Sequence, residues 1–255
     1  MSFFSVILNK IPRPVLIKLS VYLRPFADVW YRGKLFTDPI NGKSYRKFLD
    51  YGYKNLRKNA LSPGTLSLER HRLLWLYLKD QEWIWTKKDL KVMHLAPEQC
   101  FYKQFRKTKN WSYTTVDLNS PLADIKADIC DLPFEDDSFD LILCNHVLEH
   151  IPDDHKALKE LYRVMKVGGL AVLQVPLDYE RDITFEDNSI TDREKRTEIF
   201  GQYDHVRVYG MDYFKRISEV GFQSEALDFQ KNISSELIKK YALSPGELIP
   251  ICRKI

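Results

Sequence analysis

Glycine is scarce in this sequence, and its longest gap lies where a nucleotide-binding loop is expected. Only 10 of 255 residues are glycine, and none lies between Gly64 and Gly168. Glycine supplies the left-handed conformations and the close backbone approaches on which glycine-rich nucleotide loops depend. A glycine-rich loop of that kind is therefore excluded from this stretch.

Cysteines and long apolar runs are also in short supply. The four cysteines, Cys100, Cys130, Cys144 and Cys252, form no CxxC pair, and we recognise no secretory signal peptide. This pattern predicts neither a disulfide framework nor a metal site, and it predicts a reducing, cytoplasmic location. The N-terminal apolar segment is interrupted by Lys10 and Pro12, so it falls short of the ~18 to 20 residues of a membrane-spanning helix.

Positive charge is concentrated near the N-terminus. Residues 1–60 carry a formal charge of +9, although the whole chain carries only +4. Two interpretations stay open: a solvated basic face, or a surface that meets phosphate, anionic lipid or an acidic substrate. Likewise, a basic N-terminal helix either packs on the protein or makes a peripheral membrane contact.

The spacing of apolar residues predicts three regions. We expect a helical extension over residues 1–36, a small cap module with a linking helix over 37–85, and an α/β domain over 86–255. In the last region, short apolar runs alternate with helical patterns, which indicates a doubly wound, Rossmann-like parallel sheet. The expected strands are 91–96, 112–117, 139–145 and 170–176, and the clearest helix is 152–167, capped by Asp153 or Asp154 and ended by Gly168 and Gly169.

Functional side chains in such a sheet follow the carboxyl ends of its strands. Asp117 ends the second expected strand, and a carboxylate there can accept hydrogen bonds from both hydroxyls of a ribose. As an isolated residue it carries little weight. Whether Asp117 binds a ribose must be judged from the segments that follow it.

Three consecutive segments resemble the class I methyltransferases, in particular those of methyltransferase type 11. Residues 127–142 read ADICDLPFEDDSFDLI, residues 145–153 read NHVLEHIPD, and residues 161–169 read LYRVMKVGG. The resemblance implies a Rossmann-like fold, S-adenosyl-L-methionine as cofactor, and methyl transfer. It further implies that Asp128 and Ile129 meet the adenine, and that the loop from Asn145 and His146 lies near the methyl group.

The first motif of that family departs from its usual form. Where a strand ending in Asp and a glycine-rich loop are expected, the chain has His94, Ala96 and Glu98. Three explanations compete: a variant loop that still binds cofactor, with Glu98 meeting the α-amino group; a site for another ligand; or a site that binds nothing. We favour the first, because a similar His-x-Ala-Pro-Glu sequence occurs in some methyltransferase-like bacterial proteins.

The cap module looks like a zinc ribbon that has lost its thiolates. In similar methyltransferases paired cysteines occupy the positions of Asp38, Asn41, Ser62 and Thr65 in this chain. Without thiolates a tight tetrahedral zinc site is not expected. We therefore expect a metal-free module.

Polar residues gather again at 200–210. Here Arg207 and Tyr209 are candidates for substrate binding, the alternative being a turn held by internal salt bridges. If the acceptor is a hydroxyl, His146, His150 or His205 could act as the base.

The leading hypothesis is a methyltransferase acting on a small-molecule or glycan-like acceptor. The alternatives are a catalytically inactive methyltransferase-like binding or scaffold protein and, less favoured, a nucleic-acid methyltransferase. For the last we find only charge interleaved with aromatic residues.

Overall fold

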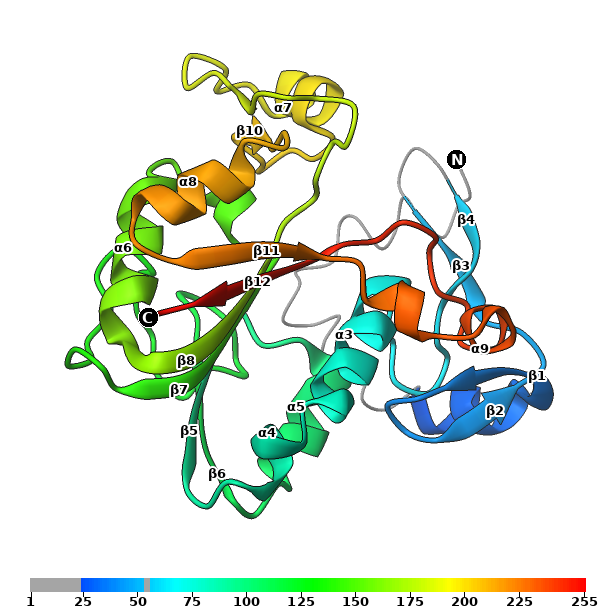
Figure 1. The fold of residues 1–255 in the computed structure, drawn as a ribbon. Helices are drawn as coiled ribbons and strands as arrows, with labels where there is room; N and C mark the ends of the chain where they lie inside the picture. Colours follow the sequence, from blue (N-terminus) through cyan, green and yellow to red (C-terminus); the bar gives the residue numbers. More distant parts are fainter. Residues whose placement is uncertain (1–23, 53–55) are drawn as a thin grey trace. The chain divides into compact units, whose positions relative to one another are not determined.

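Figure 1 shows the computed structural model, which describes residues 24–52 and 56–255. The chain divides into two compact units. The first comprises Met1–Trp85, Glu98–Lys107 and Phe229–Glu247, and the second comprises Thr86–Pro97, Thr108–Asp228 and Leu248–Ile255. The basic segment proposed for membrane contact lies mostly outside the described residues.

In the first unit, the helix expected through residue 36 is wrong over its last part. A helix occupies residues 24–30, but β1 (Arg32–Asp38) is a strand that pairs antiparallel with β2 (Lys43–Tyr45). The intervening turn ends on Gly42, whose φ of 71° suits glycine. Pairing across this hairpin overrides the local helical pattern.

The first unit also contains a second hairpin and several helices. The hairpin joins β3 (Leu49–Tyr51) to β4 (Arg57–Leu61). The linking helix expected within residues 37–85 is broken at Gln81 into α3 (Glu69–Asp80) and α4 (Glu82–Thr86). The buried Arg72 of α3 donates to the carbonyls of Tyr241 and Ala242, just after α9 (Ser235–Lys240), and Phe101 of α5 (Gln99–Arg106) stacks on Trp75.

The second unit is built on a six-stranded sheet with the order β11-β12-β8-β7-β5-β6. Four adjacent strands, ending at the edge strand β6, are parallel, as predicted: β5 (Leu90–Leu95), β6 (Trp111–Val116), β7 (Phe139–Asn145) and β8 (Met165–Gln174). β12 (Ile249–Arg253) runs antiparallel to both β8 and β11 (Gln223–Leu227). This is the doubly wound, Rossmann-like architecture predicted from the sequence.

Burial explains why these segments are strands. Every residue of β7 is buried, as expected for a strand covered on both faces. On one side of the sheet lie α6 (Asp154–Val164) and α8 (Tyr213–Glu219), which are neighbours in Figure 1. Met93, Ile142 and Leu161 belong to the core between these layers.

Helix α6 begins as predicted and ends earlier than predicted. The Asp153 side chain accepts a hydrogen bond from the Lys156 amide and caps the first turn. The helix ends at Val164. Gly168 and Gly169 therefore do not end the helix but lie inside β8. Pairing of Phe139 with Met165 draws these residues into the sheet.

Two short strands and one helix complete the second unit. β9 (Phe185–Glu186) pairs with β10 (Arg207–Val208), and α7 (Arg193–Phe200) lies between them in sequence. No helix among the described residues has both the length and the apolar character to cross a bilayer.

Candidate functional site

The register of the parallel strands brings four chain segments to one edge of the sheet. Leu95 pairs with Val116 and Cys144, and Asn145 pairs with Gln174. The residues that follow β5, β6 and β7, namely Ala96, Asp117 and His146, therefore emerge at the same carboxyl edge. Ligands bind at this edge in doubly wound folds.

Ala96 keeps the backbone conformation for which a glycine is usual. Its φ is 47°, in the left-handed region, and its amide donates to the carbonyl of Val116 at 2.9 Å. A residue with a β-carbon adopts this conformation at a cost of roughly 1–2 kcal/mol. The loop shape therefore does not require glycine here, although the sequence alone suggested that a β-carbon would oppose it.

The two other residues of the variant motif have internal partners. The ring of His94 is fully buried in β5, and its Nδ1 lies 2.7 Å from the Tyr113 hydroxyl on β6, so it ties the two strands together. Glu98 begins α5 in the first unit, where its carboxylate lies 3.9 Å from Nε2 of His71. A direct role of either side chain in cofactor binding stays a prediction.

Asp117 presents a carboxylate that is fixed on one side and open on the other. Its Oδ1 accepts hydrogen bonds from the amides of Asn119 and Ser120, both at 2.7 Å. Among the described residues Oδ2 has no hydrogen-bond partner. One oxygen therefore holds the loop in shape while the other can accept a hydrogen bond from a ribose hydroxyl.

Asp128 and Ile129 follow in the segment that the resemblance assigns to the adenine. Asp128 is exposed, and its Oδ1 accepts from the Cys130 amide at 2.9 Å. Ile129 is only 5% exposed and belongs to the core. Their contact with adenine stays a prediction.

Buried polar atoms without protein partners mark the edge beyond β7 and β8. Both side-chain polar atoms of Gln174 and Nε2 of His146 are buried, with no hydrogen-bond partner among the described residues. Asn145 is also buried at the end of β7, and His146 has a left-handed φ of 54°. Such atoms are normally satisfied in proteins by ordered water or a ligand, so the edge fits a polar cofactor.

The loop after β7 also brings three candidate bases close to a carboxylate. Glu149, His150 and His205 each offer a ligand atom within 4.8 Å of the others, and Nδ1 of His146 lies 3.2 Å from Glu149 Oε1. Glu149 is 1% exposed. Burial lowers the pKa of His205 and keeps its ring neutral.

Sequence reasoning missed Glu149. It lies next to the predicted His150 in the segment NHVLEHIPD. Its proximity to His205 arises from the fold, because the Val206 amide donates to the Glu149 carbonyl at 2.9 Å. No local signal in the sequence reports this contact.

Arg207 and Tyr209, predicted to bind substrate, are both buried and have internal partners. Arg207 is 2% exposed and donates to the carbonyls of Leu148, Ile151 and Pro152 and to the carboxylate of Glu186. Tyr209 is fully buried and donates to Asp154 at 2.8 Å. These internal partners favour the alternative of an internally braced turn, and substrate binding by either residue stays a prediction.

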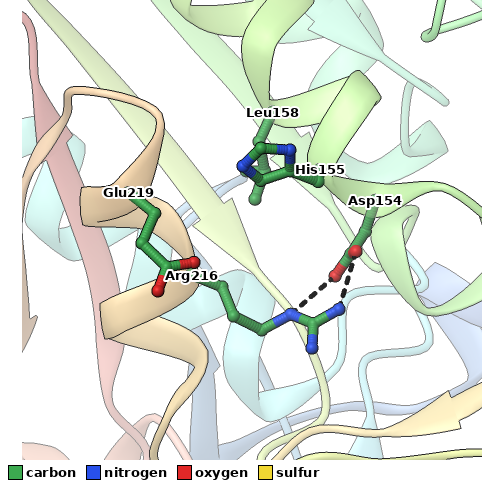
Figure 2. A pocket seen from close by; sticks show the side chains of 5 residues that line it. All are labelled: Asp154, His155, Leu158, Arg216 and Glu219. Carbon is green, nitrogen blue, oxygen red and sulfur yellow. Dashed lines mark hydrogen bonds and ion pairs between the residues drawn. The ribbon is translucent and has the colours of Figure 1, made fainter.

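A hollow of about 230 Å³ lies beside this brace but does not coincide with the strand edge. Figure 2 shows its lining from α6 and α8: Asp154, His155, Leu158, Arg216 and Glu219. Arg216 binds Asp154 through two hydrogen bonds, of 2.8 and 3.2 Å. Asp154, the buried acidic residue of this lining, is therefore paired with Arg216.

Hydrogen bonds link the degenerate zinc-ribbon positions in the first unit. The buried Asp38 carboxylate accepts from the hydroxyls of Thr65 and Ser67 and from the Ile40 amide. Asn41 turns instead to the Tyr45 hydroxyl. These side chains thus join the two turns that thiolates would join through a metal.

Comparison with known proteins agrees with this geometry. Residues 91–173 match the family model described as methyltransferase domain, and this segment contains the four parallel strands and most of the carboxyl edge. The match and the fold together make this segment a class I, S-adenosylmethionine-dependent methyltransferase domain.

Among curated proteins, a demethylmenaquinone methyltransferase of Staphylococcus carnosus is 42% identical over 66 residues, which are 26% of this chain and 24% of the relative. One from Staphylococcus epidermidis is 44% identical over 48 residues, 19% of this chain and 20% of the relative. The chain thus spans about a quarter of the length of the curated relatives it matches.

Solved structures with a similar trace include a SAM-dependent methyltransferase from Archaeoglobus fulgidus. It is 17% identical, with a TM-score of 0.44, over 71% of this chain and 93% of that one. The [4+2]-cyclase SpnF is 12% identical, with a TM-score of 0.48, over 85% of this chain and 90% of that one.

Proposed function

We propose that this protein is an S-adenosylmethionine-dependent methyltransferase that acts on a small-molecule or glycan-like acceptor. The observation that carries the proposal is the geometry of Asp117, whose carboxylate is anchored through one oxygen and open at the other. The position fits a ribose, and it lies in the segment that matches the methyltransferase domain.

The other residues of the edge support the same cofactor. Ala96 gives the loop after β5 a glycine-like turn, and Gln174 and His146 offer buried polar atoms that need partners. Asp117 would hold the ribose, Asp128 and Ile129 the adenine, and the loop at Asn145 and His146 would border the methyl group. The bound cofactor supplies an activated methyl group on a sulfonium.

The residues of this chain contribute mainly position. Methyl transfer is an in-line displacement with a neutral leaving group, so holding donor and acceptor in line supplies much of the rate. The brace at Arg207 keeps the loop after β7 in place, since three carbonyls of that loop bind one guanidinium. An acceptor placed against this loop would meet a pre-organised wall.

The small-molecule class of acceptor rests on two supports. The curated relatives are named for demethylmenaquinone, a small-molecule acceptor, although the match covers only a quarter of each chain. In addition, the sequence shows no recognised nucleic-acid-binding module.

Calorimetry with S-adenosylmethionine on Asp117→Asn tests the proposal. Asparagine keeps one acceptor oxygen for the loop amides but replaces the open oxygen with an NH2 group and removes the charge. Loss of a charge-assisted hydrogen bond of about 1.5–3 kcal/mol predicts affinity weakened roughly 10- to 150-fold. Asp89→Asn, at the amino end of the same sheet, is the matched control and should bind like the wild type.

Two results would count against the proposal. Wild-type protein that takes up no cofactor at millimolar concentration rejects a methyltransferase. Tight binding without formation of S-adenosylhomocysteine across a panel of hydroxyl, amine and quinol acceptors favours the catalytically inactive binding protein instead.

A further inference from the structure

The cluster beyond β7 has the composition of a metal site. Glu149 and His150 come from the short 3-10 helix Leu148–His150, and His205 comes from the segment before β10. Their ligand atoms lie within 4.8 Å of one another, and the rings of the two histidines meet edge to face with centroids 4.7 Å apart. All three belong to the second unit.

Hydrogen bonds fix both histidines in the form that binds metals. Nδ1 of His150 lies 3.2 Å from the carbonyl of Asp204, and Nδ1 of His205 lies 3.2 Å from the carbonyl of Phe200. A carbonyl can only accept, so each Nδ1 carries a proton, and Nε2 is the ring atom whose lone pair can bind a metal. Metal-bound histidines typically donate their other ring N–H in this way.

Only one of the two carboxyl oxygens of Glu149 has a partner among the described residues. The residue is 1% exposed; its Oε1 contacts His146, and its Oε2 is buried without a hydrogen-bond partner among the described residues. A buried carboxylate oxygen with nothing to bind is costly unless a cation or water meets it.

We propose that Glu149, His150 and His205 bind a divalent transition-metal ion, with His146 positioning the carboxylate from behind. Two imidazoles and one carboxylate suit Zn²⁺ or a neighbouring first-row ion, whereas Mg²⁺ and Ca²⁺ prefer oxygen ligands. The sequence predicted no metal because it offers no CxxC pair, and this site uses no thiolate.

The metal site also restricts the chemical class of the methyl acceptor, an inference that rests on the proposed function. A three-ligand site leaves coordination positions open, and a divalent ion there lowers the pKa of a bound hydroxyl or water. The loop that carries Glu149 and His150 follows directly from the residues expected near the methyl group. An acceptor with a metal-binding oxygen fits this arrangement best.

Zinc titration of tag-free protein without cofactor tests the site. We expect one Zn²⁺ per chain in competition with a chromogenic chelator. Glu149→Gln and His205→Gln should each weaken binding by at least about 100-fold, more than the roughly 10- to 100-fold typical of a residue behind a ligand. His155→Gln, an exposed histidine on α6, is the matched control and should bind zinc within about twofold of the wild type.

X-ray absorption on the zinc-loaded wild type keeps the test independent of how well the variants fold. A first shell of imidazole nitrogen and carboxylate oxygen without sulfur supports the site. A shell containing sulfur, a shell of oxygen alone, no zinc uptake, or uptake unchanged in both ligand variants would each overturn it. Because S-adenosylmethionine is absent from these measurements, their failure would leave the proposed methyltransferase activity standing.

Discussion

Replacing Arg207 with lysine should loosen the loop that carries Glu149 and His150. Lysine keeps the charge, but its ammonium is a single point and cannot span three carbonyls and a carboxylate as the planar guanidinium does. At least two of the bonds to Leu148, Ile151 and Pro152 are lost in a buried site. At roughly 1–3 kcal/mol for each buried carbonyl left unpaired, loss of two such bonds should cost the variant about 2–6 kcal/mol.

Hydrogen exchange and urea unfolding together measure this loss. We expect the urea midpoint of Arg207→Lys to fall, and the amides of residues 146–151 to exchange at least about 30-fold faster than in wild type, as a 2 kcal/mol loss predicts. Arg193→Lys, on the exposed face of α7, should stay within about 0.5 kcal/mol. Exchange and midpoint both unchanged in Arg207→Lys would refute the role assigned to this brace.

Two further variants test local features. Ala96→Gly removes the strain of a left-handed alanine, a gain of roughly 1–2 kcal/mol that is offset by about 0.4–1 kcal/mol of extra unfolded-state entropy. The urea midpoint of Ala96→Gly should therefore rise slightly, whereas that of Ala96→Val should fall. A lower midpoint for Ala96→Gly would contradict the left-handed backbone assigned to this residue. Burial opposes ionisation of Asp154, but Arg216, Arg207 and Tyr209 outweigh it and lower its pKa below the usual 3.8. Its stabilising effect is therefore present above pH 3.8 and lost as pH falls through the lowered value, so the stability gap between wild type and Asp154→Asn should be largest near neutral pH and close in acid. A gap that widens in acid would reverse that sign.

Local patterns in the sequence were enough to predict the sheet. Mostly apolar runs revealed β5 and β7, because a strand covered on both faces is largely apolar along its length. The Asp153 cap and the start of α6 followed from a side chain suited to bind free amides. Asp117 could be placed at the carboxyl edge of the sheet because parallel strands all end at the same edge.

Features that depend on tertiary contacts could not be predicted in this way. Arg207 and Tyr209 are polar and were assigned to a substrate surface, yet the fold buries them against carbonyls more than fifty residues away in sequence. The same holds for Glu149 and His205, which are distant in sequence and come together only in the tertiary fold. The left-handed conformation of Ala96 was also hidden, since the cost of a β-carbon there is small enough for the surrounding strands to overcome.

A crystal structure with bound S-adenosylhomocysteine tests the central claim most directly. The account predicts the ligand at the carboxyl edge of β5, β6 and β7, with a ribose hydroxyl donating to Oδ2 of Asp117 and the amides of Asn119 and Ser120 still on Oδ1. A ligand bound elsewhere, or a ribose held without Asp117, would contradict it.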